Sequence, residues 1–165
     1  ELDELQQLID KTAAYQMGVA LLARDPILSL GREQNIHVWV SNQEPDWKHD
    51  LHQSNLDLAI LLAYQLAQNW KAHITLNMAV PDEETKEKAS QFLAERIKLA
   101  RLPKETTFFV TTKPFDEALA ETPRADLTML GLSHEPDLEV MKKISEQVNG
   151  SCIFVRGSGE ESVLA

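Results

Sequence analysis

The sequence is short of cysteine and of long apolar runs, and each shortage excludes a class of protein. Cys152 is the single cysteine among 165 residues, so no disulfide framework can form and a reducing compartment is expected. The longest uninterrupted apolar run, residues 58–64, is far shorter than the ~20 residues that a membrane-spanning helix needs. We therefore expect no direct membrane insertion by this segment. Because the chain begins with Glu1 rather than Met, we expect it to be a piece of a longer protein.

Basic residues are outnumbered. Sixteen lysines and arginines face 26 aspartates and glutamates, which gives a formal net charge of −10. Such a chain repels nucleic acid and anionic lipid head groups unless a basic patch compensates, and the sequence shows no such patch. We expect no nucleic-acid partner.

Glycine is scarce where a nucleotide-binding protein would need it. Six glycines are present, and Gly131, at the end of an apolar run, is followed next by Gly150. The loop after Val40 carries acidic residues and no glycine, so it would repel a phosphate group. Neither the dinucleotide fingerprint nor the P-loop pattern occurs, and we expect no cofactor.

The last third of the chain has the clearest organisation. Residues 127–132 and 151–155 are short apolar runs without charges, which are typical of strands buried on both faces of a parallel sheet. Between them, apolar residues recur at helical spacing, at Leu138, Met141, Ile144 and Val148. The segment 124–156 therefore predicts a strand–helix–strand unit.

The rest of the chain continues this alternation. We predict strands at 17–23, 36–40, 72–80 and 106–112, helices at 51–69, 81–103 and 114–121, and an antiparallel edge strand at 162–164. The order predicts an α/β domain over 17–165 with an open, mostly parallel sheet and helices on both faces. Residues 1–16 are predicted to form an amphipathic lead-in or linker helix.

The helix predicted at 51–69 is apolar around most of its circumference. One stripe is the expected core face, but further apolar residues extend the surface to the opposite side, at Leu58, Leu61, Leu62 and Tyr64. Two interpretations are open. The helix is squeezed between the sheet and its neighbours, or these four residues form a subunit or domain interface.

Two patterns suggest chemistry only weakly. Ser133, after Gly131, is a near miss for the nucleophile elbow because the second glycine is absent. His49 and His52, near two aspartates, have spacing that suits a metal, although acidic loops with histidines are common. We therefore expect no catalytic residues and no metal site. Arg156, at the end of an apolar run, is expected to form an ion pair with a residue such as Asp126.

Several short motifs resemble one known family. Ala125-Asp126-Leu127, the strand closing in Val155-Arg156-Gly157 and the tail Ser162-Val163-Leu164 resemble the end of the cytosolic C-terminal domain of cation–chloride cotransporters. Upstream, Val38-Trp39 resembles the family's Ile-Asp-Val-Trp-Trp strand, and Trp70-Lys71 resembles the Trp-Lys that precedes its next strand. The likeness covers about residues 17–165. His37 and Val40 depart from the family's usual Asp and second Trp, and the long insertions of animal members are absent, which favours a compact, prokaryotic-like member.

The resemblance carries functional expectations. It implies a non-catalytic regulatory and dimerisation domain on the cytoplasmic side of the plasma or inner membrane. The partners would be a second copy of the chain and the membrane domain of the same polypeptide, which couples chloride to sodium or potassium transport. The implied fold is similar to that of universal stress proteins and is Rossmann-like. The alternative is a free-standing nucleotide-binding protein of the universal-stress type, although the glycine pattern by which many of those proteins hold ATP is missing.

Overall fold

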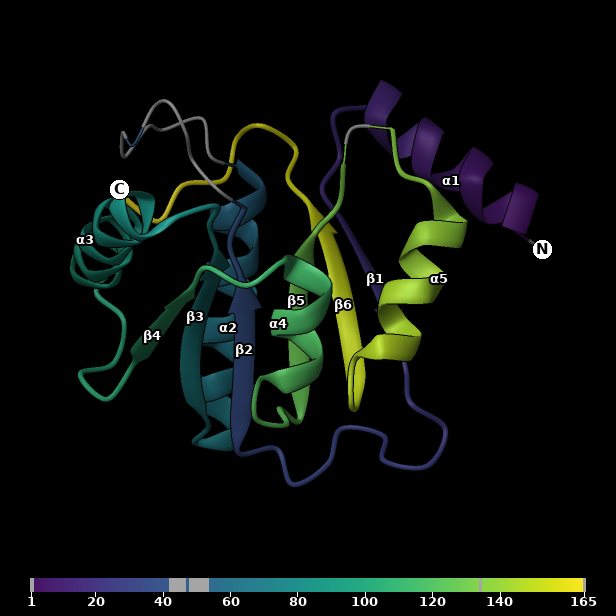
Figure 1. Ribbon diagram of the computed structural model, residues 1–165. Helices are drawn as coiled ribbons and strands as arrows, with labels where there is room; N and C mark the ends of the chain where they lie inside the picture. Colours follow the sequence, from purple (N-terminus) through teal and green to yellow (C-terminus); the bar gives the residue numbers. More distant parts are fainter. Residues whose placement is uncertain (1, 42–46, 48–53, 134, 165) are drawn as a thin grey trace.

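The computed structural model describes residues 2–41, 47, 54–133 and 135–164, which form one sheet with helices on both faces (Figure 1). The strands are β1 Val19–Ala23, β2 Asn35–Trp39, β3 His73–Ala79, β4 Thr107–Thr111, β5 Leu127–Gly131 and β6 Ser151–Arg156. The helices are α1 Leu2–Ala14, α2 Ser54–Trp70, α3 Glu83–Leu99, α4 Phe115–Glu121 and α5 Leu138–Gln147.

The strand order in the described sheet is β1-β6-β5-β2-β3-β4, and every neighbouring pair is parallel except β1 with β6. The predicted open, mostly parallel α/β sheet is thus confirmed. The chain moves from β2 through β3 to β4 in one direction and then returns to β5 and β6 in the other. Since crossovers are right-handed, the first two connecting helices and the last two must lie on opposite faces.

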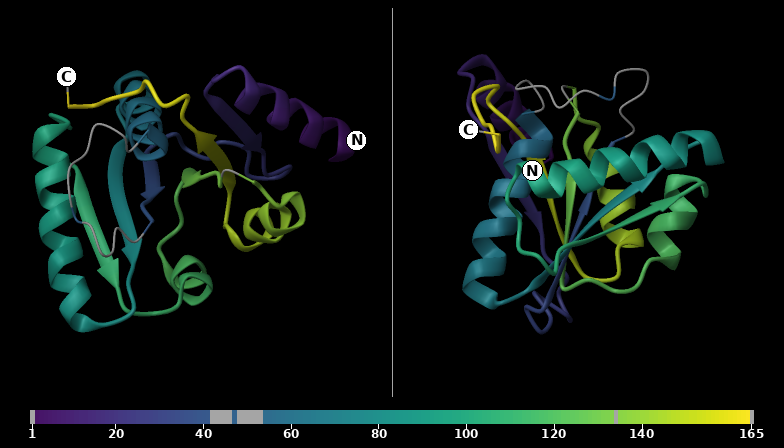
Figure 2. Two further views of the ribbon diagram at one scale, coloured as in Figure 1. Left: turned by 90° about the horizontal axis from the view of Figure 1, so that it is seen from above. Right: turned by 90° about the vertical axis from the view of Figure 1, so that its left-hand side faces the viewer.

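The two faces have separate apolar cores. On one, α2 and α3 pack on alternate residues of the central strands, including Val38, Leu76 and Met129. On the other, residues of α1, α4 and α5 form a second cluster that includes Trp39, whose ring lies edge-on to that of Phe115 with the ring centroids 5.3 Å apart. Seen from above, α2 and α4 lie on opposite sides of the sheet (Figure 2).

The antiparallel edge strand is β1, not the predicted strand at 162–164. The register runs from Val19 opposite Arg156 to Ala23 opposite Cys152, so β1 occupies the outer edge of β6. Residues 162–164 form no strand. The N–H of Val163 donates instead to Asp57 Oδ2 at 3.3 Å, and its side chain packs against the core beneath α2 and α3.

The strand–helix–strand unit at the end of the chain forms as predicted. Asp137 caps α5, because its side chain accepts the N–H groups of Glu139 and Val140. After α5 the backbone turns at Gly150, whose φ of 140° an L side chain rarely adopts. A Cβ there would also lie 3.1 Å from the carbonyl oxygen of Ala125.

Asp126 organises the loop that leads into β2. Its carboxylate is buried and accepts the backbone N–H groups of Arg32, Gln34 and Asn35, each at 2.9 Å. Gly31 passes so close, with φ of 58°, that a Cβ there would collide with this carboxylate. Burial works to raise the pKa of Asp126, but the three N–H donors hold it below the ordinary value of 3.8.

We expect Asp126→Ala to lower the free energy of unfolding by about 1–3 kcal/mol, because three backbone N–H groups lose their acceptor. Because its folded-state pKa is depressed, the carboxylate stabilises the fold above pH 3.8, and that stabilisation is lost as pH falls through the folded-state pKa. Urea unfolding at neutral and at acidic pH measures both effects. Asp116→Ala, at an exposed position on α4, is the control. Equal losses in the two variants would refute this role for Asp126.

Candidate interface on helix α2 and the pocket at the end of strand β6

Helix α2 covers the sheet with one side, and its outward side carries two exposed apolar residues. Ala59, Ile60 and Ala63 are buried against the strands. On the outward side, Leu61 and Tyr64 keep 41% and 39% of their surface exposed. The helix is therefore not enclosed on all sides.

The other two residues of the predicted interface are less available. Leu58 and Leu62 are half-buried and pack against the core beneath α2. Leu58 also lies beside β1, since a Cβ at Gly18 would be 3.5 Å from its Cδ2. The exposed part of the predicted set is thus Leu61 and Tyr64, with Leu58 and Leu62 forming the flank of the helix.

Sequence reasoning missed an apolar residue beside this flank. Leu22 of β1 pairs with Ile153 of β6, and paired residues in neighbouring strands point to the same face of a sheet. Ile153 packs against the core under α2, so Leu22 faces the same side, where it is 54% exposed. An apolar surface therefore extends from α2 towards the edge strand. The alternation of β1 could have suggested one exposed face, but not which helix lies next to it.

A buried ion pair fixes α2 to α3. The carboxylate of Asp57 and the guanidinium of Arg96 are in contact, and both side chains are fully buried. Burial raises the pKa of Asp57, and the charge of Arg96 opposes that rise. Because Asp57 also accepts the N–H of Val163, the pair joins α2, α3 and the C-terminal tail.

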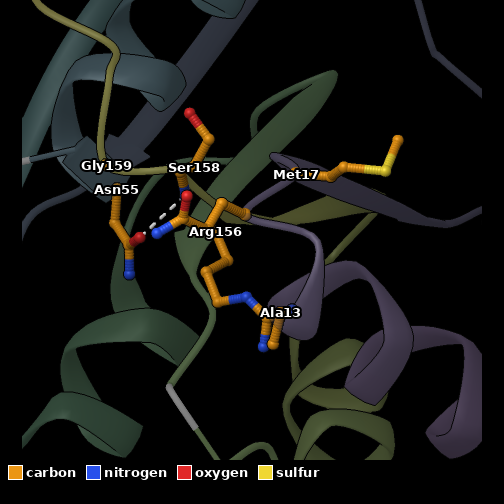
Figure 3. A pocket seen from close by; sticks show the side chains of 8 residues that line it. Ala13, Met17, Asn55, Arg156, Ser158 and Gly159 are labelled. Atoms are coloured by element: carbon orange, nitrogen blue, oxygen red, sulfur yellow. Dashed lines mark hydrogen bonds between the residues drawn. The ribbon is translucent and has the colours of Figure 1, made fainter.

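Asn55 attaches the first turn of α2 to the ends of two strands. Its Nδ2 donates to the carbonyl oxygen of Leu132 at 2.9 Å, and its Oδ1 accepts the N–H of Gly157 at 2.8 Å. The second contact is the dashed line in Figure 3. Together with Asp57, this residue holds both the helix and the tail in register with the sheet.

A pocket of about 360 Å³ lies at the carboxyl end of β6, between α1 and α2. Figure 3 shows the Arg156 side chain extending towards Ala13 of α1. Its Nη2 donates to the carbonyl oxygen of Ile9 at 2.9 Å and to Thr12 Oγ1 at 3.0 Å. A cation near the C-terminal end of α1 is favoured by the helix dipole. Arg156 therefore anchors the lead-in helix to the sheet.

The predicted ion pair between Arg156 and Asp126 is wrong. Strands β5 and β6 are parallel, with Leu127 opposite Ser151, so Asp126 lies beside the start of β6 and Arg156 at its end. The sequence shows both residues next to apolar runs but not at which end of the sheet each lies.

The loop after β6 already holds a carboxylate of its own chain. The N–H of Ser158 donates to both carboxylate oxygens of Glu161, at 2.9 and 2.8 Å. An external anion in this loop would have to displace that carboxylate. The pocket thus lies at a strand end, where ligands bind in such sheets, but its donors are used to hold the chain together.

Among the described residues, the remaining sequence candidates do not come together in a reactive site. The hydroxyl of Ser133 donates to the carbonyl oxygen of Glu135 at 2.9 Å. His49 and His52 lie outside the described residues. Burial raises the pKa of the Cys152 thiol to about 12, so this residue is a small apolar core residue. Within the described ranges, no three His, Cys, Asp or Glu side chains are grouped as a metal would require.

The family follows from a comparison of sequences. A model of the prokaryotic cation-chloride cotransporter, C-terminal domain, 2nd, matches residues 31–164. The chain belongs to this family. The match includes the strand with Val38-Trp39, Trp70-Lys71 and the Val-Arg-Gly end of β6, the motifs that carried the resemblance. A search of curated proteins gave no match.

A solved structure agrees with the family. This cotransporter domain is similar to the crystal structure of the cytoplasmic domain of a prokaryotic cation chloride cotransporter, with a TM-score of 0.89 and 33% sequence identity. The similarity covers 98% of the present chain and 61% of the solved one. The chain therefore spans less than two thirds of that domain. No helix in the described part of the chain is both long and apolar enough to cross a membrane.

Removing one partner of the buried pair should cost far more than removing an exposed charge. We expect Arg96→Met to lower the free energy of unfolding by about 3–5 kcal/mol, because Asp57 is left buried and unpaired. Asp57→Leu combined with Arg96→Met should recover most of this loss. Urea unfolding measures both, with Lys88→Met, from an exposed pair with Glu84, as the control. A double variant no more stable than Arg96→Met alone would contradict this explanation.

Proposed function

We propose that this chain is a regulatory and dimerisation domain on the cytoplasmic side of a membrane cotransporter that couples chloride to sodium or potassium transport. It acts by binding protein and catalyses no reaction. The membrane domain of the same polypeptide and a second copy of the chain are its partners. Membership of the cotransporter family carries this proposal, together with the solved relative described as a cytoplasmic domain.

The surface of α2 supports a protein partner. Leu61, Tyr64 and Leu22 are large apolar side chains exposed on the α2 face of the sheet, and exposed apolar surface that gathers on one face commonly marks an interaction site. The 17 residues of α2 extend over about 25 Å, which is long enough for a helix-mediated contact. The outward side of α2 also carries Gln65, Gln68 and Asn69, so the interface would combine apolar and polar contacts.

A symmetric contact through this side needs little rearrangement. The inner side of α2 is fixed by Asp57, Asn55 and the core, so the outer side is already in place before a partner arrives. A preformed surface of this kind loses less entropy on association. In a two-fold dimer the same residues would face each other.

The test is sedimentation of the 165-residue chain across micromolar concentrations. We expect self-association of the 18.6 kDa chain, and we expect Leu61→Glu combined with Tyr64→Glu to give the monomer, because two like charges per chain would be buried in the contact. Val140→Glu, at an exposed apolar position on α5, should behave as the unchanged chain. A monomer at every concentration before any substitution would refute the dimerisation role.

The regulatory role is tested in the complete cotransporter. The Leu61→Glu/Tyr64→Glu pair should change chloride-dependent cation uptake into vesicles, whereas Val140→Glu should leave it unaltered. Equal uptake in all three proteins, at equal amounts in the membrane, would leave the domain without a regulatory role through this surface.

A further inference from the structure

Helix α4 leaves part of its own face of the sheet uncovered. It has seven residues, and Figure 1 shows no helix in front of β3 and β4. Because side chains alternate along a strand, the residues next to the core positions Leu76 and Val110 point to this open face. They include Thr75 and Asn77 of β3 and Phe109 of β4, and the register places Asn77 directly beside Phe109.

A cavity of about 460 Å³ lies between this face and α4. Its volume is within the range of small-molecule sites, roughly 300–1,000 Å³. The sheet contributes its floor, and the C-terminal end of α4 with Pro123 contributes one wall. Phe109, which is 50% exposed, supplies an aromatic surface.

Asn77 lines this cavity, and only one of the two polar atoms of its side-chain amide forms a hydrogen bond. The residue is 1% exposed. Its Nδ2 donates to the carbonyl oxygen of Thr75 at 3.3 Å, whereas its Oδ1 has no hydrogen-bond partner among the described residues. A buried oxygen without a donor destabilises a fold, and an apolar residue of the same size would avoid this cost. Because Asn77 lines the cavity, a turn of its side chain would present this unpaired oxygen as the acceptor for a bound molecule.

The charges around the cavity favour an uncharged ligand. Lys113 and Glu121 line it as an exposed ion pair, so their opposite charges largely cancel. The imidazole of His37, in the floor, is buried, and burial together with the nearby His73 lowers its pKa. Thr75 and Thr111 add only hydroxyl groups. A charged ligand would lose hydration here, and the opposite charge that it could meet, on Lys113 or Glu121, is already paired.

We propose that this cavity binds an uncharged planar small molecule, whose N–H group donates to Asn77 Oδ1 while its ring packs on Phe109. Primary aromatic amides and amino-heterocycles belong to this class. The site lies on the opposite face of the sheet from the outer side of α2, so it does not depend on the proposed dimerisation.

The first test is a nuclear magnetic resonance titration of the 165-residue chain with benzamide and with benzoate. The two probes have nearly the same shape, but benzamide is uncharged and carries N–H donors, whereas benzoate is charged and has none. We expect benzamide to cause saturable shifts at the amides of Asn77, Phe109 and Thr111. Benzoate at the same concentrations should cause less than a tenth of these shifts.

Variants then assign the two contacts. Asn77→Leu should fold with an unchanged or higher thermal midpoint and should bind benzamide about five- to tenfold more weakly, the loss expected for one hydrogen bond. Phe109→Ala should weaken binding similarly, and it keeps the proposal testable if Asn77→Leu does not fold. Phe108→Ala is the matched control, because Phe108 is also an exposed residue of β4 but pairs with Leu76 on the other face.

Three results would overturn the proposal. The first is the absence of shifts at these amides in the unchanged chain. The second is binding that Phe109→Ala and Phe108→Ala weaken equally. The third is shifts at the same amides that depend on protein concentration without any probe, because a second copy of the chain would then cover this face.

Discussion

The contact between Asp57 of α2 and Arg96 of α3 is the constraint on which one whole face of this domain depends. Both side chains are fully buried, and the same carboxylate accepts the backbone N–H of Val163, so three segments distant in the sequence meet at one group. A buried ion pair adds little stability over an apolar contact of equal volume. It nevertheless favours one arrangement of the helices, since any other would leave a charge buried and unpaired. The pair therefore sets how α2 lies on the sheet, and with it the direction in which Leu61 and Tyr64 point.

The order of the crossovers leaves the two faces of the sheet covered by helices to different extents. The crossovers from β2 to β4 place the long helices α2 and α3 on one face, and their outer surface is apolar at Leu61. The return from β4 to β5 passes through α4, which is too short to cover both β3 and β4. One face is thus suited to a protein partner and the other contains a cavity of ligand size. The strand-end pocket beside Arg156, by contrast, is lined by groups that attach α1 and the tail.

The sequence predicted those helices and strands that have a clear hydrophobic periodicity. The unit at 124–156 has two apolar runs and a helical stripe, from which the α/β fold could be predicted. Val38-Trp39 lies in a strand that belongs to the family's pattern, from which the family could be predicted. Pairing between distant segments was not. The segments 19–23 and 162–164 are equally plausible edge strands by sequence, and only the structure shows that the Val163 N–H is bound to Asp57. Likewise, no local pattern joins Asp57 to Arg96, which lies 39 residues away, or shows that Asn77 sits in an uncovered strand.

The outer face of α2 should meet the same face of a second copy, and cysteine cross-linking in the complete cotransporter tests this most directly. The chain's own Cys152 is buried and its thiol is not reactive, so within this domain only a cysteine introduced at Leu61 can react with a cross-linker. We predict that a short thiol-specific cross-linker joins two chains through Leu61→Cys but not through Val140→Cys on α5. Efficient cross-linking through Val140→Cys, with none through Leu61→Cys, would contradict the proposed interface.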